Sequence, residues 1–180
     1  MAWSTPLTAV SNATLTAAQW NASVRDNLAE TAPAKATAAG NFFVSTGANT
    51  IAQRIPVSDT INTSQTTTST SFVDLSSLPS VTTTSDTRII VWFAAQMNNT
   101  VVGAESITSV AVSGTTTTAA DDDVSCDVQQ PSSGTAFIDI TSSRVVRLTV
   151  TPGSNTYRLR YRVSAGTGAF KRRTIVALPF

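Results

Sequence analysis

The stretch that most restricts the fold is YRLRYRV, residues 157–163. Tyrosine, leucine and valine occupy every second position, and Arg158, Arg160 and Arg162 occupy the positions between them. Successive side chains of a β-strand point to opposite faces of its sheet, so this alternation predicts a strand. We expect one face of that strand to lie in a core and the other to carry a row of arginines.

Similar short apolar runs recur along the last 110 residues, and turn sequences such as SGTTTT, QQPSSG, TPGSN and SAGTG separate them. Threonine and serine supply much of the polarity, and only 13% of residues are charged, which also favours strands over helices. This pattern predicts a mainly β protein whose C-terminal part is a jelly-roll-like antiparallel β-sandwich. The predicted strands cover residues 71–75, 80–84, 88–97, 106–112, 124–128, 136–141, 144–150, 157–163 and 171–178.

One helix is predicted near the N-terminus. Thr16 and Gln19 fit a capping box, in which each side chain pairs with a backbone N–H of the other residue. Pro33 stops the helix from continuing, because proline lacks the N–H that a helix interior needs. The helix is therefore predicted over about 17–30.

Trp20, Val24 and Leu28 recur at four-residue intervals and form an apolar stripe on this helix. A helix of about 14 residues is marginally stable by itself in water, so something must cover the stripe. Either the β-domain or another chain is expected to do so.

Residues 31–70 are rich in small and polar residues and contain only short apolar islands. One island includes Phe42 and Phe43, and another covers 50–57, on either side of the predicted turn STGAN. The low-complexity run TINTSQTTTSTS reads as a linker. We therefore predict an N-terminal anchor with a helix and an extended arm over residues 1–70, and a sandwich over residues 71–180.

Two further tryptophans receive separate interpretations. Trp92 lies in the most apolar run, IIVWFAA, and is predicted to be in the core. Trp3 lies in a leader with no predicted structure, where an aromatic side chain needs a pocket on another molecule. Trp3 is therefore predicted to contact an assembly partner, as are Trp20, Val24, Leu28, Phe42 and Phe43.

Charges separate along the C-terminal half. Residues 101–143 contain six acids and no base, whereas residues 144–180 contain eight bases and no acid. Such segments attract each other, either as cross-strand ion pairs within one sheet or between subunits. Arg158, Arg160 and Arg162 are predicted to form a charged intersubunit or ligand-binding face, which could also meet a host cell-surface glycan. The near-neutral net charge of +1 and the few aromatic residues argue against nucleic-acid binding.

Catalytic, metal-binding and cofactor-binding residues are not predicted. The sequence has no histidine, and the one cysteine, Cys126, therefore has no histidine partner that could activate it. Asp121, Asp122 and Asp123 lie in an acidic loop that lacks the glycine and terminal glutamate of a calcium-binding EF-hand loop. No apolar run approaches the roughly 20 residues needed to span a bilayer, and no secretory signal is recognised, so a membrane partner is not expected.

The N-terminal third resembles the N-terminal segment of small virion proteins of tailed bacteriophages, especially those that infect actinobacteria. The resemblance lies in AAQWNASVRDNL and in KATAAGNFFVSTGANTIAQRIP. The segments TTTSTSFVDL and LTVTPGSNTYRLRYRVSAGTGAFKRRTIVALPF are similar to the end of the same family. It implies a virion component, often a homotrimer, with an anchoring N-terminus and a projecting β-domain. It implies no catalytic residue.

Three function classes follow. The first is a non-enzymatic virion structural protein, assembled in the host cytoplasm and bound to capsid or tail proteins, as a capsid decoration, head fibre or minor tail protein. The second is a receptor- or glycan-binding protein that acts in host adsorption. An enzyme is the least favoured class, because the sequence offers no catalytic constellation.

Overall fold

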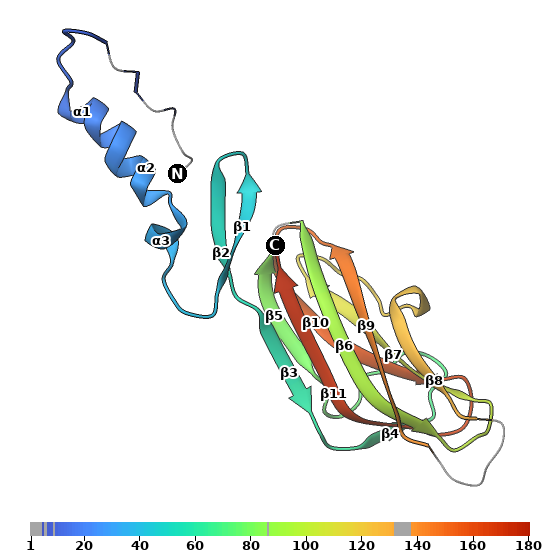
Figure 1. The fold of residues 1–180 in the computed structure, drawn as a ribbon. Coiled ribbons are helices and arrows are strands. Elements are labelled where there is room, and N and C mark those ends of the chain that lie inside the picture. The colour runs from blue at the N-terminus through green and yellow to red at the C-terminus, as the bar shows by residue number, and fades with distance from the viewer. Residues whose placement is uncertain (1–4, 6, 9, 86, 132–137) are drawn as a thin grey trace. The chain divides into compact units, whose positions relative to one another are not determined.

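The computed structural model describes residues 5, 7–8, 10–85, 87–131 and 138–180. The chain divides into two compact units, an N-terminal unit that ends at Ile55 and also takes in Phe180, and a second unit, Pro56–Pro179 (Figure 1). The predicted boundary at residue 70 is therefore too late. Strands β3 (Val57–Ile61) and β4 (Gln65–Thr67) lie within the predicted anchor, but both pair with strand β11 (Gly168–Pro179) of the sandwich.

The predicted helix is present over the expected residues. It consists of α1 (Ala17–Trp20), a π-helical turn η1 (Asn21–Arg25) and α2 (Asp26–Ala29). The capping box is formed, because the Gln19 N–H donates to Thr16 Oγ1 at 3.2 Å and the Thr16 N–H donates to Gln19 Oε1 at 2.9 Å. A separate turn, α3 (Ala32–Lys35), follows and holds Pro33 in its first turn, where a missing N–H costs little.

The two apolar islands after the helix form a hairpin, as predicted. Strand β1 (Phe42–Gly47) pairs with β2 (Thr50–Arg54) in antiparallel register, with Phe42 opposite Arg54 and Val44 opposite Ala52. Asn49 takes a φ of 56° in the connecting turn, a left-handed conformation that asparagine tolerates better than most residues.

The second unit is an antiparallel sandwich in which one sheet has the order β5-β10-β7-β8 and the other the order β3-β11-β6-β9, with β4 also paired to β11. Leaving β4 aside, the first strand of the unit pairs with the last, the second with the seventh, the third with the sixth and the fourth with the fifth. This nested pairing defines a jelly roll, so the predicted fold class is confirmed. The remaining strands are β5 (Ser80–Ser85), β6 (Arg88–Asn99), β7 (Glu105–Gly114), β8 (Ser125–Gln129), β9 (Ile140–Thr149) and β10 (Gly153–Val163), and a short 3-10 helix, η2 (Asp122–Val124), precedes β8.

Two predicted strands differ from the structure. Residues 71–75 contribute an isolated bridge between Val73 and Tyr161 instead of a strand. Residues 140–149 form the single strand β9, where two strands were predicted on either side of Ser142 and Ser143. Residues 136–137 of the first of these lie outside the described part of the chain.

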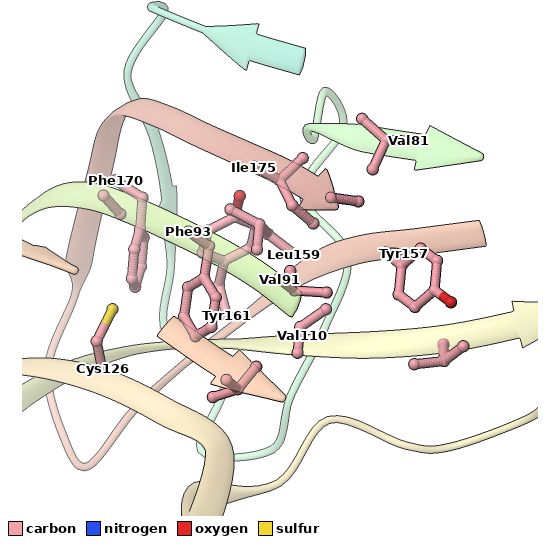
Figure 2. Packing of buried hydrophobic residues seen from close by; sticks show 14 of the residues in the cluster. Val81, Val91, Phe93, Val110, Cys126, Tyr157, Leu159, Tyr161, Phe170 and Ile175 are labelled. Atoms are coloured by element: carbon pink, nitrogen blue, oxygen red, sulfur yellow. The ribbon is translucent and has the colours of Figure 1, made fainter. Parts of the chain in front are cut away.

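The core lies between the two sheets and follows the alternation of the sequence. The fully buried residues include Ile89, Val91, Phe93, Ala95 and Met97 of β6 and Tyr157, Leu159, Tyr161 and Val163 of β10. Figure 2 shows Val91 and Phe93 packed with Leu159 and Tyr161. Burying each large apolar side chain contributes about 1.5–3 kcal/mol, so these two strands supply much of the driving force for folding. Trp92 is not in this core, contrary to prediction. It lies between the buried residues Val91 and Phe93, so its side chain points outward, and it is 47% exposed.

A buried arginine explains why the predicted linker belongs to the sandwich. Arg173 is fully buried and lies at a bulge in the pairing of β11 with β6, directly after Arg172, which has a φ of 48°. Its guanidinium donates to the carbonyl oxygens of Thr63 at 2.9 Å and Ser77 at 2.8 Å, and to Gln65 Oε1 at 3.2 Å. These hydrogen bonds tie residues 63–77 to the sheet.

Candidate functional site

The described residues of the N-terminal unit form no apolar core of their own. Among its described residues Asn27 alone is buried, and every described core residue of the chain belongs to the sandwich. Asn27 uses its amide within the helix, donating to the Ser23 carbonyl oxygen at 3.0 Å. A unit folded this way leaves its apolar side chains in contact with solvent, which is unfavourable unless a partner covers them.

The predicted stripe takes part in this exposure. Trp20 is 54% exposed and Leu28 is 59% exposed, and Val24 between them is half-buried. The structure therefore places Trp20 and Leu28 at exposed positions of the helix and Val24 at a partly exposed one. An apolar surface of this kind commonly marks a binding interface.

The leader before the helix completes an apolar cavity over the stripe. The Leu7 N–H donates to Ser23 Oγ at 2.8 Å, which holds the leader against the helix. The cavity has a volume of about 410 Å³ and is lined by Leu7, Thr8, Val10, Ala13, Thr14, Leu15, Gln19, Trp20, Ser23 and Val24. We define these lining residues together with Leu28 as the anchor surface. The sequence reading missed Leu7 and Val10 because isolated apolar residues in a leader carry no periodicity.

Other predicted anchor residues lie elsewhere. Phe42 and Phe43 are half-buried in the β1–β2 hairpin and do not line the cavity. Thr37 fixes the segment before the hairpin, since its N–H and its hydroxyl both donate to Gln53 Oε1, at 3.0 and 3.1 Å. Trp3 lies outside the described residues.

The predicted arginine face exists on the outer side of β10, and its charges are paired within the chain. Arg160 Nε lies 2.8 Å from Asp74 Oδ1, and Arg158 Nη1 lies 3.4 Å from Asp74 Oδ2. Arg162 makes a two-pronged contact with Asp122, at 3.0 Å through Nε and 2.6 Å through Nη2. The predicted attraction between the acidic and basic segments thus accounts for the Arg162 pair, but Asp74 comes from an earlier part of the sequence.

A shallow groove of about 580 Å³ lies beside this face, lined by Thr70, Ser71, Phe72, Ala119, Ala120, Asp121, Asp122, Arg160 and Arg162. The Arg162 guanidinium carbon lies 5.4 Å from the centre of the Phe72 ring, a cation–π contact that helps to fix both side chains. The groove combines fixed donors and acceptors with a small apolar wall. Because each arginine has a carboxylate partner, the groove is not suited to a strongly anionic ligand.

The acidic loop serves the fold. The Asp121 side chain accepts a hydrogen bond from the Asp123 N–H at 2.8 Å and so caps η2, and the Asp121 carbonyl accepts one from Ser109 Oγ at 2.7 Å. Within the described ranges, no three acidic, histidine or cysteine side chains come together as a metal site.

The Cys126 side chain is buried in the core, and this burial raises the pKa of its thiol to about 11. At neutral pH the group is therefore protonated and a poor nucleophile.

No helix in the described part of the chain is long and apolar enough to cross a membrane.

Sequence comparison yields no match to any protein-family model or to any curated protein. Solved structures with a similar fold include the Eiger TNF of S. frugiperda, with 9% identity, a TM-score of 0.48, and 71% of this chain and 92% of that chain covered. The infectious bursal disease virus Gx strain has 13% identity, a TM-score of 0.41, and coverage of 76% and 36%. The VP2 subviral particle of that virus has 13% identity, a TM-score of 0.40, and coverage of 74% and 40%. This chain thus spans less than half of either viral chain.

Proposed function

We propose that this protein is a non-enzymatic structural component of a bacteriophage virion. The observation that carries the proposal is the N-terminal unit, in which no described apolar side chain is buried while Trp20 and Leu28 remain exposed beside an apolar cavity. Such a unit gains its apolar cover by joining a larger assembly, and the sandwich has a complete core that can stand free of that assembly. The resemblance of residues 2–56 to phage virion proteins supports the same conclusion.

The anchor surface is the proposed attachment site, and the sandwich is the projecting part. A capsid decoration or head fibre and a minor tail protein both need this division of labour. Copy number distinguishes them, because a capsid surface offers many equivalent sites and a tail tip offers few. Quantitative gel analysis of purified virions measures it directly.

Substitution of the anchor surface tests the proposal. A phage that carries Trp20→Ser together with Leu28→Ser is expected to assemble particles that lack this protein, because the apolar contacts that hold it are removed. Ile138→Ser is the matched control, since Ile138 is also an exposed apolar residue but belongs to the sandwich. Normal incorporation of the double variant would refute the proposed attachment.

The groove beside Arg160 and Arg162 favours a second candidate function, receptor or glycan binding during adsorption. Its donors are held by Asp74 and Asp122, and Phe72 supplies an apolar surface, an arrangement that suits a neutral sugar chain better than an acidic one. Purified wild-type protein is then expected to block adsorption of the phage to its host, and Phe72→Ala with Arg160→Ala is expected to block it less. Equal blocking by both proteins, or none by either, would exclude this use of the groove.

A further inference from the structure

The outer face of the β3-β11-β6-β9 sheet carries a continuous apolar patch that the proposed attachment does not use. Trp92 of β6 lies opposite Val145 of β9 on one side and Val176 of β11 on the other. Two residues earlier on β6 and on the same face, Ile90 lies opposite Leu178 of β11. Trp92 is 47% exposed and Val145 is 64% exposed. We name these five residues the Trp92 patch. An exposed tryptophan at the centre of an apolar surface is a frequent centre of protein–protein interfaces.

The charges around the Trp92 patch are basic. Arg147 of β9 lies opposite Ile90 and therefore on the same outer face, and Arg88 lies two residues before Ile90 on β6. Both are exposed, and neither forms an ion pair with any described residue. A complementary partner must therefore present apolar groups beside acidic ones.

Another surface of the same domain has that character. Val101 and Val102 are exposed in the turn before β7, and Val102 is 49% exposed. Glu105 of β7 lies opposite Gln129 of β8, and Gln129 Nε2 donates to the Gly103 carbonyl at 3.0 Å, which holds the turn against this edge.

Asp127 of β8 completes this second surface. It lies opposite Ile107, so it shares the outer face of its sheet with Glu105. Within the described residues neither carboxylate has an ion-pair partner. We name Val101, Val102, Glu105 and Asp127 the Val102 patch.

We propose that the Trp92 patch of one subunit binds the Val102 patch of a second copy of this chain. The two patches differ, so the contact is head-to-tail, and its repetition closes into a ring when the rotation allows it. Arg88 and Arg147 then face Glu105 and Asp127 of the neighbour, which sets the register, while Trp92 and Val145 supply buried apolar area. The inference deepens the proposed function by identifying how projecting domains associate, but it does not depend on attachment to a particle.

Light scattering of the purified full-length chain between 1 and about 100 µM tests the proposal. The wild-type protein is expected to be oligomeric at the higher concentrations, and Trp92→Ser with Val145→Ser is expected to weaken association at least about tenfold. Arg147→Glu and Glu105→Arg are each expected to weaken it similarly, because like charges then meet in the contact. Arg147→Glu combined with Glu105→Arg is expected to restore association, a result that damage to the fold cannot produce.

Two controls separate this contact from the anchor surface. Trp20→Ser with Leu28→Ser is expected to leave the solution oligomer intact, and Arg172→Glu, a charge reversal at an exposed position outside both patches, is expected to do the same. A monomeric wild-type chain at about 100 µM would overturn the proposal. It would equally be overturned by an oligomer that responds to the Trp20 and Leu28 substitutions but not to those at Trp92 and Val145.

Discussion

Arg173 is the residue on which the edge of the sandwich depends most. Its guanidinium is fully buried, stacks over the Tyr161 ring at 5.5 Å and satisfies the carbonyl oxygens of Thr63 and Ser77. We predict that Arg173→Met lowers the free energy of unfolding by about 2–4 kcal/mol, because it removes a buried donor group together with three part-buried hydrogen bonds. Urea denaturation of the full chain measures this loss. A change below about 0.5 kcal/mol would mean that water replaces the guanidinium.

Cys126 gives a prediction about pH. Burial raises the pKa of the folded thiol from 9.0 to about 11, so the folded state holds the proton more tightly than the unfolded state does. The resulting stability is complete below pH 9 and is lost as the pH rises from 9 through about 11. Unfolding midpoints are therefore expected to fall over this range, and to fall less in Cys126→Ala. An identical decline in both proteins would contradict this account.

The burial of single residues was predicted correctly where apolar and polar side chains alternate along a strand, and wrongly where they do not. Tyr157, Leu159 and Tyr161 are buried as the alternation with arginine predicted. Trp92 was predicted wrongly because every position around it is apolar, and a continuous apolar run does not reveal which side faces the core. Only the pairing of β6 with its neighbours decides that.

At the scale of elements, the helix shows how much local sequence determines. The capping box of Thr16 and Gln19 and the end near Glu30 follow from the sequence and are present in the structure. The π-helical turn at Asn21–Arg25 was not predicted, since no local signal marks such turns.

Thr16→Ala is expected to destabilise the helix by about 1 kcal/mol through loss of the N-cap. Because no core of described residues covers the helix, this change should appear as roughly fivefold faster amide exchange over residues 17–29 of the free chain. Thr66→Ala, at an exposed position in the sandwich, serves as the control. Unchanged exchange in the helix would show that packing, not capping, sets its stability.

The predicted linker illustrates why some elements cannot be read locally. The run predicted as a linker, residues 60–71, is threonine- and serine-rich and reads as flexible, yet it holds the end of β3 and all of β4. Their partner, β11, lies more than a hundred residues later in the sequence, and Arg173 of that strand donates the hydrogen bonds that fix Thr63 and Gln65. Low-complexity composition alone does not distinguish a linker from an edge strand whose partner is distant.

At the scale of the whole molecule, the sandwich is expected to fold without the N-terminal unit, because its described core residues all belong to Pro56–Pro179. Limited proteolysis is predicted to cut first before Pro56 and to leave a resistant fragment. The denaturation midpoint of that fragment should match that of the full chain. A markedly lower midpoint would show that the N-terminal unit contributes to the sandwich core.

We propose that the exposed apolar side chains of the N-terminal unit are covered by the particle that it joins. Amide hydrogen exchange of residues 10–55, measured in the free chain and in purified virions, tests this most directly. We predict weak protection in the free chain and strong protection in virions, with the strands β6 and β10 protected in both. Strong protection of residues 10–55 in the free chain, or no gain of protection in virions, would contradict the claim.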